Sequence, residues 1–220
     1  ACRRILKGRS RRRLNPLFVG WLMGWPIGHA LCACSATEFT LWQQHSDPVR
    51  GLDLVARLLG ARGRVLPMAS TPLQMRARVR GDDPARPDEV TEVAGQVEVA
   101  RTPGLVESVA VEPADPEIPA ETLAAIEGAD WIVLGPGSWY TSVLPHLLVP
   151  RLREAVVSAP GRRALVLNLE LDTSETSGWS APGHLESLRD HAPDLRLDTV
   201  LADPTVVDDV EELEEACRAF

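Results

Sequence analysis

A glycine-rich turn carries the side chains best suited to chemistry. The apolar run Trp131-Ile132-Val133-Leu134 predicts a buried strand, and it leads directly into the sequence Gly135-Pro136-Gly137-Ser138. Glycine lets a backbone turn sharply and approach a ligand closely, and hydroxyl groups follow at Thr141 and Ser142. We therefore expect main-chain amides here to be open to a phosphate, although a tight strand-to-helix turn with capping hydroxyls fits the same spacing.

A second polar loop follows the next predicted strand. It begins at Asn168 and continues through Asp172 to Gly178. Loops at the carboxyl ends of parallel strands share the edge where open α/β sheets bind ligands. Asn168 can then donate to and accept from a base or sugar, and Glu175 can accept from sugar hydroxyls. The alternative is that Asn168 bonds its own loop and residues 173–177 only cap a helix.

Catalytic and metal sites are not indicated. The five histidines lack the HxxxH spacing of a metal site, so surface or capping roles are expected for His146 and His184. No nucleophile is paired with a base. The acidic residues from Asp208 to Glu215 are typical of a solvated helix face.

Strands and helices alternate over the second half of the chain. Helices are predicted at 47–59, from Pro119, at 149–158, 180–191 and 210–220, and strands at 131–134, 164–167 and 195–201. Four shorter segments, 64–68, 73–79, 96–100 and 106–112, are predicted as strands, and 81–92 as a solvated loop. These elements predict an α/β fold with a Rossmann-like, doubly wound, mainly parallel sheet and a small antiparallel excursion.

Composition limits the partners. The 220 residues are 45% hydrophobic, with 31 acidic and 23 basic residues and a net charge of −8. An acidic chain attracts neither nucleic acid nor an anionic membrane, so an anionic ligand must be held by local dipoles. Cysteines without CxxC pairs favour reduced thiols and a cytoplasmic protein. The basic start with Arg11-Arg12 before an apolar stretch leaves an export signal, and hence a secreted adaptor, as a third reading.

The segment 129–150 (ADWIVLGPGSWYTSVLPHLLVP) closely resembles the hallmark of the CofD/YvcK-like family. Segments 64–68, 72–73, 95–97 and 168–169, followed by Glu175-Thr176, support the YvcK branch, and the resemblance covers about 47–215. Against the family pattern, the glycine-rich start and the Asp-Asp-Gly-Gly-Ser segment are absent. Trp25 and His29 replace a polar pair, and Ser174 replaces a glycine. We therefore divide the chain into an atypical segment 1–34 and an α/β domain 35–220, incomplete at both ends.

The resemblance implies a binding protein more than an enzyme. The YvcK branch, called gluconeogenesis factors, is associated with UDP-sugars, especially UDP-N-acetylglucosamine, and with cell shape and cell-wall homeostasis. No cofactor is implied, and homo-oligomerisation stays open. The alternative is a CofD-like 2-phospho-L-lactate transferase of deazaflavin biosynthesis, which would need a divalent ion. By matching position, the phosphates would contact Gly135, Gly137, Ser138, Thr141 and Ser142, and the nucleotide or sugar would contact Asn168, Glu175 and Thr176.

Overall fold

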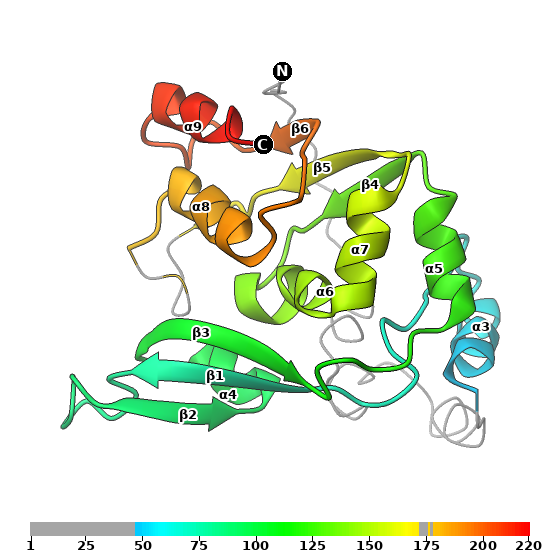
Figure 1. The fold of residues 1–220 in the computed structure, drawn as a ribbon, viewed down its shortest axis with the longest axis horizontal. Helices are drawn as coiled ribbons and strands as arrows, with labels where there is room; N and C mark the ends of the chain where they lie inside the picture. The colour runs from blue at the N-terminus through cyan, green and yellow to red at the C-terminus, as the bar shows by residue number, and fades with distance from the viewer. Residues whose placement is uncertain (1–46, 172–175, 177) are drawn as a thin grey trace.

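A computed structural model describes residues 47–171, 176 and 178–220. These residues form an α/β fold with two three-stranded sheets, one antiparallel and one parallel (Figure 1). The predicted fold class is therefore confirmed, and the antiparallel excursion has as many strands as the parallel sheet. Predictions that fall on residues 1–46, on 172–175 or on Ser177 lie outside the described residues.

The chain enters the described region through α3 (Pro48–Leu58), where the sequence predicted an amphipathic helix. The Asp47 carboxylate accepts hydrogen bonds from the amides of Val49 and Arg50, and Pro48 occupies the first turn. Both features favour helix initiation, because the first amides of a helix have no partner within the helix and proline lacks an amide hydrogen. The following segment 64–68, predicted as a strand, has no strand pairing, and the Pro67 carbonyl instead accepts a hydrogen bond from Thr122.

The antiparallel sheet has the order β2-β1-β3, formed by β1 (Gln74–Arg80), β2 (Val90–Ala94) and β3 (Leu105–Glu112). Its buried face comprises Met75, Ala77, Val79, Val106, Val109 and Val111, and helix α4 (Gln96–Arg101) contacts β1 and β2. The prediction of a strand over 96–100 is wrong, because these residues form α4. Residues 90–94 pair with β1 in its place, and Gly95, with φ of +110°, turns the chain into the helix.

The parallel sheet has the order β4-β5-β6, formed by β4 (Trp131–Leu134), β5 (Arg162–Val166) and β6 (Thr199–Leu201). Helix α5 (Ala120–Glu127) precedes β4, and α6 (Pro145–Leu148) and α7 (Pro150–Ser158) connect β4 to β5. Helix α8 (Ala181–His191) connects β5 to β6, and α9 (Val210–Cys217) packs on α8. Parallel strands need such crossovers, so the alternation seen in the sequence positions the loops after β4 and β5 at one edge.

One core joins the two sheets. Leu134 and Leu165 from neighbouring parallel strands lie in the same buried cluster as Val79 and Val106 from the antiparallel sheet. Between them lies η1 (Trp139–Val143), a single turn of π-helix that follows the glycine-rich turn. Its Tyr140 hydroxyl lies 3.4 Å from the Val106 carbonyl of β3. The turn after β4 is therefore anchored to both sheets.

Candidate functional site

The glycine-rich turn lies at the carboxyl end of β4, where the sequence predicted it. Gly135 has φ of +73° and Gly137 has φ of +152°, a backbone region that residues with a Cβ rarely adopt. A Cβ on Gly135 would lie 2.6 Å from the Val166 carbonyl oxygen of β5, and one on Gly137 would lie 3.1 Å from the Ser142 Cβ. Both glycines are therefore required by the packing of the turn itself.

Ser138 organises the π-turn that follows. Its hydroxyl accepts a hydrogen bond from the Thr141 amide at 3.2 Å and is also bonded to the Thr141 hydroxyl. Its carbonyl accepts from the amides of Ser142 at 2.9 Å and Val143 at 3.2 Å. Thr141 is fully buried, whereas Ser138 and Ser142 are half-buried. The hydroxyls of Ser138 and Ser142 thus lie nearer to solvent than that of Thr141.

The side chain of Asn168 clamps the turn. Its Oδ1 accepts a hydrogen bond from the Gly137 amide at 2.8 Å, and its Nδ2 donates to the Gly137 carbonyl at 2.9 Å. The loops after β4 and β5 are thereby joined across 31 residues of sequence. We expected amides of this turn to be open to a ligand, and for Gly137, Thr141 and Ser142 that prediction is wrong, because each of these amides donates to a group of the protein itself. The carboxamide still has a second N–H and a second lone pair to offer.

The loop after β5 holds the other predicted residues. Thr176 is buried, and its hydroxyl donates a hydrogen bond to the Leu171 carbonyl at 2.8 Å. Glu175 lies outside the described residues. Near the start of this loop, Leu169 is 75% exposed and Glu170 is exposed. The structure therefore brings Gly135, Gly137, Ser138, Thr141, Ser142 and Asn168 together, and it gives Thr176 a role within its own loop.

An aromatic cluster that the sequence did not predict packs against the π-turn. Trp139 of η1 and Trp179 both pack edge-on against the His184 ring of α8, with centroid distances of 4.9 and 5.3 Å. The Trp139 indole N–H donates to the Ser187 hydroxyl at 3.1 Å. His184 is only 2% exposed, and burial lowers the pKa of its imidazole. Of the two roles expected for His184, surface or capping, the surface role is therefore wrong, and the ring is instead hydrogen-bonded to the carbonyl of Ser180, the N-cap residue of α8.

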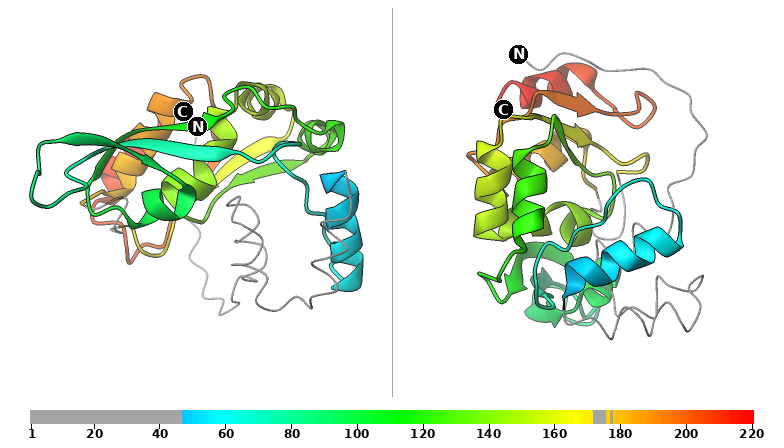
Figure 2. Two further views of the ribbon diagram at one scale, coloured as in Figure 1. Left: turned by 90° about the horizontal axis from the view of Figure 1, so that it is seen from below. Right: turned by 90° about the vertical axis from the view of Figure 1, so that its right-hand side faces the viewer.

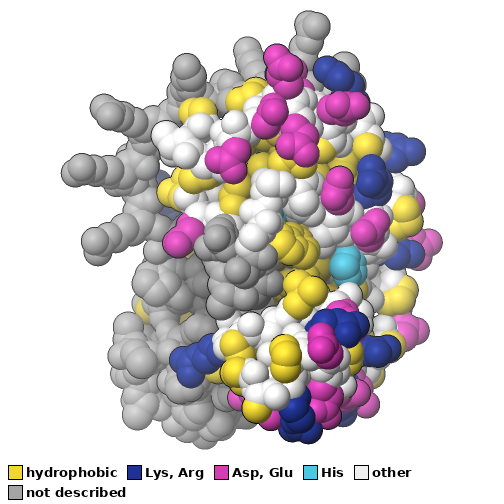
Figure 3. Space-filling model, turned by 90° about the vertical axis from the view of Figure 1, so that its left-hand side faces the viewer, with side chains coloured by type: hydrophobic (Ala, Val, Ile, Leu, Met, Phe, Trp, Pro, Cys, Tyr) yellow, Lys and Arg dark blue, Asp and Glu magenta, His cyan; other side chains and the backbone are white. Residues whose placement is uncertain are grey.

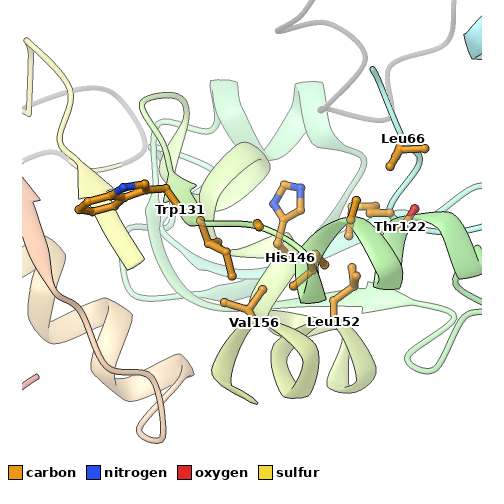
Figure 4. Close-up of a pocket in the computed structure, with 11 residues that line it drawn as sticks. Leu66, Thr122, Trp131, His146, Leu152 and Val156 are labelled. Atoms are coloured by element: carbon orange, nitrogen blue, oxygen red, sulfur yellow. The ribbon is translucent and has the colours of Figure 1, made fainter. Parts of the chain in front are cut away.

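A hollow lies between α5, β4 and α7. This cavity of about 280 Å³ is lined mainly by apolar side chains, including Leu66, Ile126, Trp131 and Val156 (Figure 4). His146 of α6 projects into it, with its ring bonded to main-chain carbonyls of Ser142 and Val143. Burial lowers the pKa of this imidazole, although the His146 side chain is only half-buried. The apolar lining gives this hollow little to hold a phosphate or sugar with.

Acidic side chains are concentrated on α9, in the upper part of Figure 3, and they are exposed as the sequence predicted. Within residues 47–171, 176 and 178–220, no group of three His, Cys, Asp or Glu side chains could hold a metal ion. No helix in the same ranges is long and apolar enough to cross a bilayer. In the turn itself, the side chains placed for a ligand are neutral and polar.

The chain belongs to the CofD family. The family model for 2-phospho-L-lactate transferase CofD matches residues 37–218. A putative gluconeogenesis factor of Mycobacterium tuberculosis is 43% identical over 199 residues, which is 90% of this chain and 56% of that protein. The gluconeogenesis factor of Bacillus subtilis is 30% identical over 188 residues, which is 86% of this chain and 55% of that protein.

A solved structure has the same fold. The crystal structure of a upf0052-family protein of Bacillus halodurans is 26% identical in sequence, with a TM-score of 0.70. The match covers 92% of this chain and 70% of that one. The resemblance noticed in the sequence is therefore confirmed at the level of family and fold. The chain spans a little over half the length of the mycobacterial and B. subtilis relatives.

Proposed function

We propose that this chain forms part of a nucleotide-sugar site and acts as a regulatory protein of the gluconeogenesis-factor type, without catalysis. UDP-N-acetylglucosamine is the ligand we favour. By binding it, the protein would take part in the regulation of cell shape and of cell-wall precursor homeostasis. The 43% identity to a relative named as a gluconeogenesis factor supports this choice. In this proposal the protein is cytoplasmic and binds neither nucleic acid nor membrane.

One observation carries the proposal: the two hydrogen bonds that join Asn168 to Gly137. They fix together the loops after two adjacent parallel strands, at the edge where open α/β sheets bind ligands. A ligand meets a preformed surface there, so little conformational entropy is lost on binding. Because the Gly137 amide is already engaged, we assign the phosphate contacts chiefly to the hydroxyls of Ser138 and Ser142. The second N–H of Asn168 then suits a sugar or base oxygen.

Isothermal titration with UDP-N-acetylglucosamine tests the proposal. Ser138→Ala removes a half-buried hydroxyl at the turn and should weaken binding several-fold, which corresponds to about 1 kcal/mol. Ser108→Ala, at an exposed position of β3, is the matched control and should leave the affinity unchanged. Absence of heat at millimolar ligand with folded protein contradicts the proposal.

A phospholactyl transferase is the second candidate, and the description of the matching family model favours it. That reaction would pass a phospholactyl group from a guanylylated donor to a deazaflavin precursor. The donor diphosphate would call for a divalent ion held by acidic groups. A turnover assay with donor, acceptor and Mg²⁺ separates the two functions. Product formation assigns the transferase, and binding of UDP-N-acetylglucosamine without turnover supports the regulator.

A further inference from the structure

The hollow between α5, β4 and α7 is large enough for a ligand of its own. Helices α5 and α7 lie side by side against the parallel sheet (Figures 1 and 2). Leu66 and Met68, from the segment that precedes β1, complete the wall of the hollow beside α5. Its volume is about 280 Å³, and an apolar cavity of about 150 Å³ is enough to hold benzene. A molecule with one aromatic ring therefore fits.

Most of the lining is apolar. Leu152 and Val156 of α7 are buried, and Ile126 of α5 and Ile132 of β4 are half-buried. Trp131 lies at one end of the hollow and is 47% exposed (Figure 4). A ligand that covers these side chains removes apolar surface from water, and an aromatic ligand can also pack against the indole ring. The lining thus favours an aromatic ligand over a charged one.

His146 adds one directional polar group. It projects into the hollow from α6, and its ring is bonded to the main-chain carbonyls of Ser142 and Val143. A carbonyl can only accept a hydrogen bond, so these contacts engage an N–H of the ring. Burial lowers the pKa of the imidazole, which is therefore neutral at pH 7 and has a single N–H. The other ring nitrogen is a hydrogen-bond acceptor.

The walls of the hollow offer that nitrogen little to bond with. Among the described side chains that line it, only Thr122 and Trp131 carry another donor group. The Thr122 hydroxyl donates to the Pro67 carbonyl at 2.7 Å, and Trp131 lies apart from His146 in Figure 4. A ligand that displaces water from the hollow should therefore bring its own donor, because an unpaired buried acceptor is costly.

We propose that the hollow binds a small aromatic molecule with one hydroxyl group, a phenol, whose hydroxyl donates to the unprotonated ring nitrogen of His146. The ligand ring lies among the apolar side chains of α5, β4 and α7. The site uses none of the hydroxyls assigned to the phosphates of a nucleotide sugar. It is therefore a second binding site, for a ligand of different chemistry.

Titration of the full chain with phenol, followed in ¹H–¹⁵N spectra, tests the proposal. Saturable shifts are expected at amides 125–132 and at His146, with the millimolar affinity typical of so small a ligand. Ala125→Trp, at an exposed position of α5 that lines the hollow, fills it and should weaken binding by about tenfold or more. Ala124→Trp, at the next exposed position and outside the lining, is the matched control and should leave the affinity unchanged. No saturable shifts at tens of millimolar phenol, or equal affinities of the two variants, overturn the proposal.

Comparison with toluene tests the hydrogen bond. Toluene has nearly the size of phenol but no hydroxyl. His146→Phe keeps an aromatic ring and removes the acceptor, so the affinity for phenol should fall about two- to tenfold relative to that for toluene. An unchanged ratio of the two affinities overturns the proposal, because a merely apolar hollow would give that result. Neither measurement involves nucleotide sugar, so failure here leaves the proposed function standing.

Discussion

The Asn168→Ala substitution tests the clamp between the two loops most severely. It removes two hydrogen bonds, of 2.8 and 2.9 Å, and leaves the amide and carbonyl of half-buried Gly137 without this partner. Each bond contributes about 0.5–1.5 kcal/mol net, so we expect the free energy of unfolding to fall by about 1–3 kcal/mol. For a chain of this size that corresponds to a decrease in Tm of roughly 2–12 °C.

Urea denaturation followed by circular dichroism measures the change. Glu170→Ala, at an exposed position in the same loop, is the control and should stay within about 0.5 kcal/mol of the wild type. Asn168→Asp should destabilise the protein less than alanine does at pH 7, because a carboxylate still accepts from the Gly137 amide and loses only the bond to the Gly137 carbonyl. If Asn168→Ala is as stable as Glu170→Ala, the clamp does not hold the turn.

Three further perturbations test the surroundings of the turn by the same denaturation assay. Gly135→Ala should lower the free energy of unfolding by more than about 2 kcal/mol, because the residue has a positive φ and its new Cβ would lie 2.6 Å from the Val166 carbonyl oxygen. Gly63→Ala is the control and should be nearly neutral, because a Cβ there meets nothing within 4 Å. The pKa of His184 is lower in the folded than in the unfolded chain, so as the pH falls the unfolded chain takes up the proton at a higher pH. The free energy of unfolding should therefore fall as the pH drops below about 6.5, and His184→Gln should make it depend less on pH. Arg163→Met should cost about 1–3 kcal/mol, because the guanidinium donates to three carbonyls at the end of α7; an unchanged stability would contradict this.

Local patterns in the sequence predicted the elements that depend on local physics. Asp47 followed by Pro48 predicts a helix start, and the apolar run 131–134 predicts a buried strand. The strand predicted at 96–100 was wrong because pairing of β2 with β1 is a tertiary contact, and Gly95 turned the chain before it. Local propensity contains no information on which of two adjacent segments will find a partner strand.

The composition of the candidate site was predictable, but its internal contacts were not. Spacing placed Ser138 and Asn168 at the ends of neighbouring strands, and the structure confirms that the two loops meet. That the Asn168 carboxamide bonds the main chain of Gly137 depends on distances of less than 3 Å between residues 31 positions apart. His184 gave no sequence signal by itself, since only the folded turn brings Trp139 and Trp179 around it.

Chemical-shift mapping with UDP-N-acetylglucosamine tests the central claim most directly. In ¹H–¹⁵N spectra of the labelled chain, the account predicts that saturating ligand shifts the amides of residues 137–142 and 168–170, which lie at the two joined loops. Amides around the apolar hollow at His146 and on β2 should stay unchanged. Shifts confined to those regions, or no shifts at millimolar ligand, would contradict the account.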